Sequence, residues 1–136
     1  WEGKVHIAHV GDSRAYLFRA GKLIQLTTDH SVAASLLMAK QIKPEELYTH
    51  PQRTLLYRYL GDEPEVEVDT IVREIEAGDK LLLCSDGLWA MVHDPQLAGI
   101  LGEDRSVGEI CHRLVQAAKD NGGEDNISVF VIQVEA

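Results

Sequence analysis

Lys80-Leu81-Leu82-Leu83-Cys84-Ser85-Asp86-Gly87, residues 80–87, is the stretch that decides the fold. Residues 80–84 form a short, almost continuous apolar run, which is typical of a strand covered on both faces. The turn signal at residues 85–87 ends this run at a polar edge. We therefore predict a central buried strand over residues 80–84 that presents Asp86 at its end.

Alternating apolar and polar residues predict further strands on both sides of this one. They cover residues 5–8, 15–19, 23–26, 66–72 and 127–134. We expect the first three, which follow one another closely, to form an antiparallel meander, with a hairpin at Gly21 between the second and third. The strand at 127–134 is expected to be covered on both sides, like the central one.

Capping residues and helical spacing predict helices between the groups of strands. Ser31 can cap a helix through Lys40, Pro44 suits the first turn of a short helix, Asp94-Pro95 begins another, and Ser106 with Glu109 forms a capping box before a helix that stops at 121–123. Strands separated by such helices indicate one α+β domain with predominantly antiparallel pairing.

The composition is that of an ordinary globular protein: 136 residues, 45% hydrophobic, 26% charged, net charge −9 and pI near 5.0. The acidic balance argues against nucleic acid as a partner, and no apolar run approaches the ~18 residues of a membrane span. Thirteen of the acidic residues fall in 69–136, either as a solvated surface or around a divalent cation. Cys84 and Cys111 are expected to be packed thiols, which favours a reducing, cytoplasmic setting.

Three aspartates lie at the edges of three predicted strands. Asp12 and Asp86 follow strands, Asp125 precedes the last one, and each is next to a glycine or within two residues of one. Taken singly, each is explained by local hydrogen bonding in a turn. If they converge, they form an oxygen-ligand set of the kind that Mg²⁺ and Mn²⁺ prefer.

Four ordered motifs give these aspartates a context. They are Gly11-Asp12-Ser13-Arg14-Ala15-Tyr16, Thr28-Asp29-His30, Leu83-Cys84-Ser85-Asp86-Gly87-Leu88-Trp89 and Gly123-Glu124-Asp125-Asn126-Ile127-Ser128-Val129. Together they closely resemble the metal-dependent type 2C (PPM-type) serine/threonine protein phosphatases. Residues 49–61 look like the flap of the bacterial branch. The resemblance implies part of an α-β-β-α sandwich of two antiparallel sheets flanked by helices. It also makes residues 1–136 the C-terminal portion of a catalytic domain, without the N-terminal portion that carries the family's Asp-Gly motif.

The resemblance also implies a chemistry. Family members hydrolyse phosphoserine and phosphothreonine on proteins with a metal-activated water, using two or three Mn²⁺ or Mg²⁺ ions per complete domain. Asp86 and Asp125 would hold the first metal, and Asp86 with Asp12 a third, weaker one. Asn126 and Gly87 would support these ligands, and no residue of this sequence is assigned a catalytic role.

Other residues are assigned more modest roles. His50 and Arg53 are candidate substrate contacts, against the alternative of a solvated loop. Arg14 is expected to fix the Asp12 turn, and His30 to have a local structural role rather than to donate a proton. We expect the fragment alone to be inactive, because the family's metal-bridging aspartate is missing from it. The alternatives are a non-catalytic regulatory or binding module on the same scaffold, and a phosphohydrolase acting on small molecules.

Overall fold

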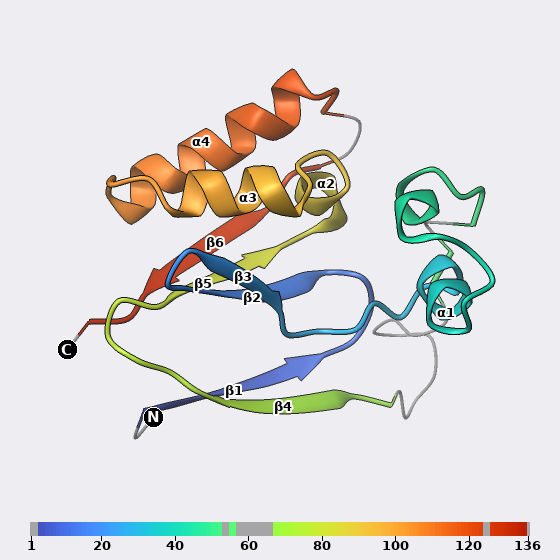
Figure 1. Cartoon of the computed structure of the whole chain (residues 1–136), viewed down its shortest axis with the longest axis horizontal. Helices are drawn as coiled ribbons and strands as arrows, with labels where there is room; N and C mark the ends of the chain where they lie inside the picture. Colours follow the sequence, from blue (N-terminus) through green and yellow to red (C-terminus); the bar gives the residue numbers. More distant parts are fainter. Residues whose placement is uncertain (1–2, 53–54, 57–66, 124–125, 136) are drawn as a thin grey trace.

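The computed structural model describes residues 3–52, 55–56, 67–123 and 126–135. Six strands and five helical segments occur in this part of the chain, arranged as two facing antiparallel sheets with a helical layer on one side (Figure 1). The prediction of an α+β sandwich with two antiparallel sheets is confirmed.

The larger sheet has four strands in the order β3-β2-β5-β6. They are β2 (Arg14–Arg19), β3 (Lys22–Gln25), β5 (Lys80–Cys84) and β6 (Val129–Gln133). The apolar run at 80–84 is the interior strand β5, and its Leu82 pairs with Tyr16 of β2 on one side and with Val131 of β6 on the other. Leu82 and Tyr16 have no exposed surface, so this pairing lies at the centre of the core.

The smaller sheet pairs β1 (Lys4–His9) with β4 (Asp69–Glu74). The expected meander of the first three strands is therefore wrong at its first step, because β1 leaves the larger sheet and lies across from it. The reason is the turn at Gly11–Ser13, called here the Asp12 turn. Gly11 has φ +104°, and the chain crosses there from one sheet to the other instead of folding back as a hairpin.

Three helices cover the outer face of the larger sheet. They are α2 (Asp86–Trp89), α3 (Asp94–Leu101) and α4 (Val107–Asp120), and they lie together above β5 and β6 in Figure 1. The apolar face of α4 buries Ile110, Leu114 and Ala118 in the main core, as its spacing predicts. Ser106 caps α4 by accepting a hydrogen bond from the Glu109 amide at 3.3 Å.

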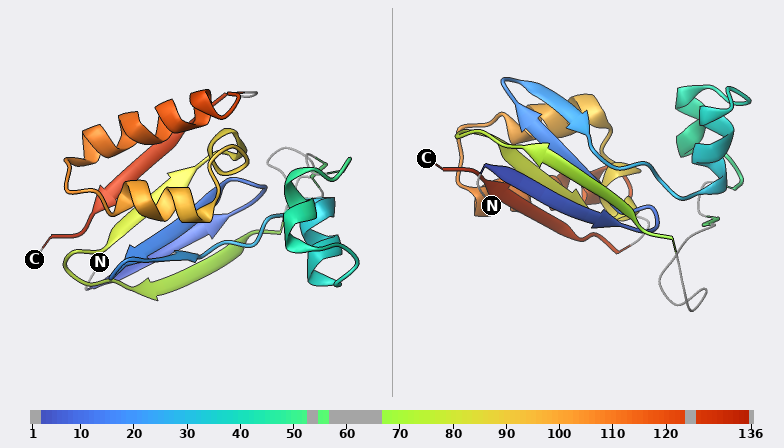
Figure 2. Two further views of the ribbon diagram at one scale, coloured as in Figure 1. Left: turned by 45° about the horizontal axis from the view of Figure 1, so that its top comes forward. Right: turned by 90° about the horizontal axis from the view of Figure 1, so that it is seen from below.

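The remaining helical segments lie at one end of the sandwich. They are α1 (Val32–Met38), capped by Ser31 as predicted, and the 3₁₀ helix η1 (Pro44–Tyr48). Figure 2 shows this pair beside the ends of both sheets rather than over the outer face of β1 and β4. Tyr48 joins η1 to the main body, because its ring stacks on His93 with centroids 3.8 Å apart.

The inner face of the larger sheet is only partly covered. The expected burial of β6 on both sides is wrong, since Phe130 is 61% and Ile132 39% exposed. Leu83 of β5 is also 39% exposed. Within the described residues the facing sheet has two strands against four, so it is too narrow to cover β6.

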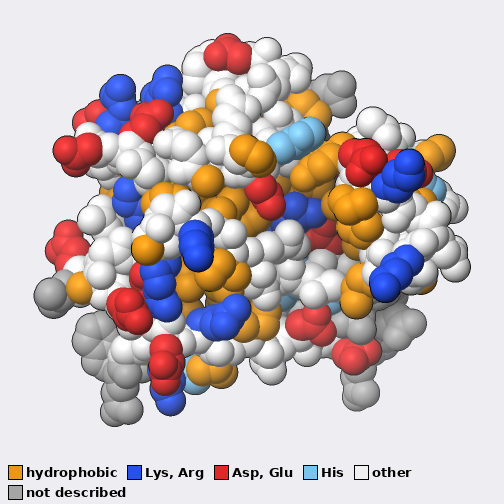
Figure 3. All heavy atoms as spheres, in the orientation of Figure 1, with side chains coloured by type: hydrophobic (Ala, Val, Ile, Leu, Met, Phe, Trp, Pro, Cys, Tyr) orange, Lys and Arg blue, Asp and Glu red, His pale blue; other side chains and the backbone are white. Residues whose placement is uncertain are grey.

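The surface shows mixed charge. On the face drawn in Figure 3, Lys and Arg side chains lie among Asp and Glu side chains, and hydrophobic groups reach the surface between helices and strands. Among the described residues, no helix combines the length and the apolar character that a membrane crossing requires.

Candidate metal centre

Segments from distant parts of the sequence meet at the end of the sandwich where β5 stops. The Asp12 turn is tied to α2 by Trp89, whose indole Nε1 donates a hydrogen bond to the Asp12 carbonyl oxygen at 2.8 Å. The start of β6 is tied to the end of β5 by Ser85, which donates its amide to Ser128 O at 3.1 Å and accepts the Ser128 amide on Oγ at 3.0 Å. These bonds hold the turn and the two strand ends beside one another.

Gly87 lets α2 approach the chain before β6. A Cβ at this position would lie 2.0 Å from the backbone oxygen of Asn126 and 2.9 Å from its carbonyl carbon. Gly87 has an ordinary helical backbone, so space and not conformational freedom requires glycine here. The contact brings Asp86, the first residue of α2, next to the segment that contains Asn126.

Two of the three predicted ligands, Asp12 and Asp86, are in the described part, and both are half-buried. Burial raises the pKa of Asp12 to about 6, and the neighbouring charges of Asp86 and then Asp29 add to the shift. The two predicted ligands are thus close enough to repel each other. Asp125 and Arg53 lie outside the described residues.

This arrangement suits a hard divalent cation. Carboxylates that are half-buried and repel one another are stabilised when a cation lies between them, and Mg²⁺ and Mn²⁺ take oxygen ligands of this kind. A structural ion pair would need a Lys or Arg between the carboxylates instead. Arg14, whose charge acts on Asp12, makes its bidentate contact with Asp29.

Arg14 joins Asp29 to Trp89 behind the candidate metal centre. Its side chain is 4% exposed, and its Nε and Nη2 donate to the Asp29 carboxylate at 2.9 and 2.6 Å. The guanidinium also lies 3.6 Å from the Trp89 ring centroid. Burial works against the charged form, but the hydrogen bonds to Asp29 outweigh it and raise the pKa of Arg14, which therefore stays protonated. Arg14 is buried, and its side chain contacts Asp29, Tyr16 and Trp89; that it fixes the Asp12 turn stays a prediction.

Other predicted residues are placed as follows. Asn126 is exposed, and its carbonyl oxygen accepts a hydrogen bond from Ser85 Oγ at 3.3 Å. His50 is half-buried just after η1, where its Nδ1 accepts the Gln52 amide at 3.0 Å. Tyr48, two residues before His50, packs against Trp89 with ring centroids 6.3 Å apart, so η1 borders the candidate centre.

Sequence reasoning did not single out His9 and Asp69, although both lie next to the Asp12 turn. They face each other in the register of β1 and β4. A signal was present, because His9 is a polar residue two positions before Gly11 and has the same parity as Val5 and Ile7, so alternation places it on the more buried face of the strand.

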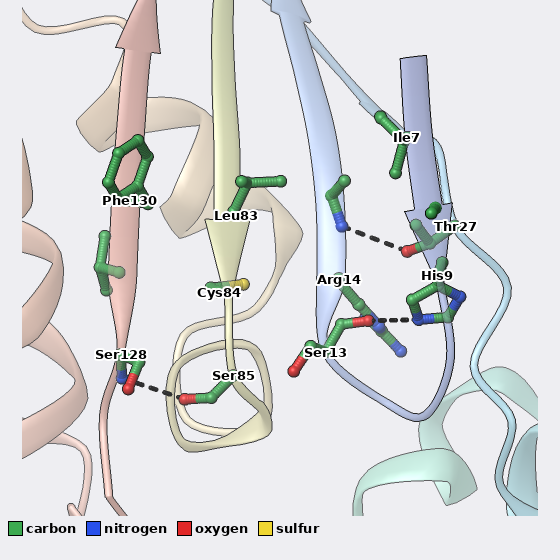
Figure 4. A pocket seen from close by; sticks show the side chains of 13 residues that line it. Ile7, His9, Ser13, Arg14, Thr27, Leu83, Cys84, Ser85, Ser128 and Phe130 are labelled. Carbon is green, nitrogen blue, oxygen red and sulfur yellow. Dashed lines mark hydrogen bonds between the residues drawn. The ribbon is translucent and has the colours of Figure 1, made fainter. Parts of the chain in front are cut away.

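A pocket of about 470 Å³ opens between the two sheets beside this end. Figure 4 shows apolar side chains such as Ile7, Leu83 and Phe130 toward one end of it and the polar Ser13, Arg14 and Ser85 toward the other. The pocket therefore extends from the partly exposed inner face of the larger sheet to the residues beside the candidate metal centre.

Comparison with known proteins finds similarity to protein phosphatases. A sequence model described as Protein phosphatase 2C matches residues 1–36. The chain is 44% identical over 132 residues to the serine/threonine phosphatase stp of Listeria welshimeri, covering 97% of this chain and 52% of that protein. It is 43% identical over 131 residues to the serine/threonine protein phosphatase PstP of Mycobacterium tuberculosis, covering 96% of this chain and 25% of that protein.

Solved structures agree. The serine/threonine phosphatase Stp1 of Staphylococcus aureus superimposes with a TM-score of 0.96 at 36% identity, over 100% of this chain and 54% of that one. The catalytic domain of the serine/threonine phosphatase PstP, solved with two manganese ions, gives a TM-score of 0.87 at 36% identity, over 98% and 55%. This chain spans about half the length of the stp protein that it matches.

Proposed function

We propose a protein phosphatase function for this chain from the premise that it belongs to the type 2C serine/threonine phosphatase family. It would form the C-terminal portion of a catalytic domain that hydrolyses phosphoserine and phosphothreonine. The observation that supports the proposal is the hydrogen bond from Trp89 Nε1 to the Asp12 carbonyl oxygen, which ties the Asp12 turn to α2, the helix that begins with Asp86.

The candidate ligands have distinct roles in this proposal. Asp86 and Asp125 would hold one Mn²⁺ or Mg²⁺ ion, and Asp12 with Asp86 a further, weaker one. When bound, the cations would supply an activated water and neutralise charge on the phosphoryl oxygens. Gly87 would set the approach of Asp86 to the loop before β6, and Asn126 would keep that loop against Ser85.

The partner would be a phosphorylated protein. The net charge of −9 argues against nucleic acid as the partner. His50 and Arg53 would contact this substrate. Support for His50 comes from its position just after η1, which packs on α2 through Tyr48 and Trp89. A reducing, cytoplasmic setting is supported by Cys84 and Cys111, both of which are free thiols.

Activity of the full-length protein that contains this chain tests the proposal. Asp86→Ala should reduce Mn²⁺-dependent hydrolysis of a phosphothreonine peptide by more than the roughly 10–100-fold expected for loss of an indirect partner. Asp12→Ala should reduce it less. The matched control is Asp104→Ala, because Asp104 is an exposed aspartate between α3 and α4.

The outcomes separate the parts of the proposal. Equal losses from Asp86→Ala and Asp12→Ala would contradict the ranking of the two sites. Wild-type activity in Asp86→Ala would contradict the proposed function itself.

A further inference from the structure

Two histidines contact the Asp12 turn, one at each end. His30 Nδ1 accepts a hydrogen bond from the Gly11 amide at 3.1 Å, and the His30 amide donates to the Gly11 carbonyl oxygen at 2.8 Å. At the other end, His9 Nε2 bonds to the Ser13 carbonyl oxygen at 2.8 Å. Figure 4 shows His9 directed from the end of β1 toward Ser13. The two residues that flank Asp12 are thus both held by imidazole nitrogens.

The partners fix the tautomer of each ring. A backbone amide can only donate, so His30 Nδ1 carries a lone pair and the ring proton lies on Nε2. That proton points to Asp69, whose Oδ2 is 2.7 Å from His30 Nε2. A carbonyl oxygen can only accept, so His9 carries its proton on Nε2. The turn therefore uses the bare Nδ1 of His30 as an acceptor and the Nε2–H of His9 as a donor.

Asp69 connects this arrangement to the smaller sheet. It is the register partner of His9 in the pairing of β1 with β4, and it orients His30 from that position. The His9 and His30 rings pack with centroids 4.8 Å apart, and their side chains are almost completely buried. Strand pairing at this end thus determines where both rings lie, and the rings determine the conformation of the turn.

A second metal site is the competing interpretation of these residues. Donor atoms of His9, His30 and Asp69 lie within 4.8 Å of one another, and among the described residues His9 Nδ1 has no hydrogen-bond partner. A metal on His30 Nε2 would displace the ring proton while the Gly11 amide still occupies Nδ1. The ring would then have to give up its last proton, or the Gly11 bond would have to break. The hydrogen bonds therefore favour a structural arrangement over a metal site.

We infer that His9 and His30 are positioning residues that clamp the Gly11–Ser13 turn, so that Asp12 presents its carboxylate to the cation site, with Asp69 orienting His30. The inference rests on the proposed role of Asp12 as a cation ligand. Neither histidine contacts substrate or cation in this assignment. Each acts through a backbone group next to Asp12.

Four substitutions test the clamp with two residue types. An Asn oxygen can replace Nδ1 of histidine, and a Gln amide can replace Nε2–H. His30→Asn and His9→Gln should therefore keep the contacts with the turn, while His30→Gln and His9→Asn should lose them. Because the types are exchanged between the positions, a general effect of Asn or Gln cannot produce this pattern.

Two readouts apply to the full-length protein. Calorimetric titration with Mn²⁺ measures the weakest site, and hydrogen exchange measures protection of the Gly11 amide. We expect His30→Gln and His9→Asn to weaken that site roughly 10–100-fold, the range for residues that orient metal ligands. His30→Gln should also expose the Gly11 amide to exchange. His30→Asn and His9→Gln should stay closer to wild type than their counterparts in both measurements, although His30→Asn gives up the contact with Asp69.

Several outcomes would overturn the inference. Equal effects of Asn and Gln at each position, in proportion to lost stability, would indicate packing alone. A His30 ring protonated on Nδ1 in ¹⁵N NMR spectra would contradict the assigned tautomer. Tight Zn²⁺ binding abolished by both His9→Gln and Asp69→Asn would establish the metal site instead. If Asp12→Ala leaves Mn²⁺ binding unchanged while the Gly11 exchange pattern holds, the proposed ligand role fails and the clamp itself stands.

Discussion

Gly87→Ala offers a direct test of how α2 and the chain before β6 fit together. The added methyl group would lie 2.0 Å from Asn126 O, whereas Cβ contacts under 3.0 Å essentially do not occur. The two backbones would have to separate by at least about 1 Å, because neither contact atom belongs to a side chain that could rotate away. We expect the free energy of unfolding to fall by about 3 kcal/mol, the upper end of the usual range for overpacking a core.

Urea unfolding followed by circular dichroism measures this loss. Gly99→Ala in α3 is the matched control, because a Cβ there meets nothing within 4 Å and the position is exposed. It should raise the free energy of unfolding by up to about 1 kcal/mol, the difference in helix propensity. If Gly87→Ala were as stable as Gly99→Ala, the close approach that positions Asp86 would be refuted.

Three further predictions concern acid stability, thiol chemistry and the open sheet face. The hydrogen bonds from Arg19, opposed by burial, lower the pKa of Asp79, so its contribution is present above pH ~4 and is lost as the pH falls through the folded-state pKa. Asp79→Ala should cost about 1–3 kcal/mol at pH 7 and less at pH 2, as measured by denaturation at both values. Burial raises the pKa of the Cys84 thiol to about 12, so an aromatic disulfide at pH 8 should modify the half-exposed Cys111 first and Cys84 only after unfolding; equal rates would contradict this. For the polypeptide of residues 1–136, Phe130→Ser should reduce binding of a hydrophobic dye and change stability by no more than about 0.5 kcal/mol, since the ring is 61% exposed; unchanged dye binding would argue against an open face.

Local signals in the sequence predicted the helices well. Ser31 and Ser106 begin helices as expected, because a cap is a contact between residues three apart. Helix α3 begins one residue earlier than expected, with His93 rather than Asp94 in the cap position. Helix α2 was not predicted, because its four residues are too few to show a helical period.

Long-range pairing was harder to predict. Alternation identified β1 as a strand but could not show that its partner is β4, 60 to 70 residues away, because alternation describes the faces of a strand and not its neighbours. For the same reason the sequence could not show that His9 and Asp69 lie beside each other. The ordered motifs predict that Asp12 and Asp86 come together, and the hydrogen bond from Trp89 to the Asp12 carbonyl oxygen joins the two motifs that contain them.

The span between Trp89 and Asp12 has a consequence for protein synthesis. The indole that fixes the Asp12 carbonyl comes 77 residues later in the chain, and the segment against Gly87 later still. As the ribosome releases this stretch, Asp12 emerges long before the groups that hold it. A nascent chain halted before residue 126 has the first aspartate without the last strand, so the candidate centre can mature only after translation has passed β6.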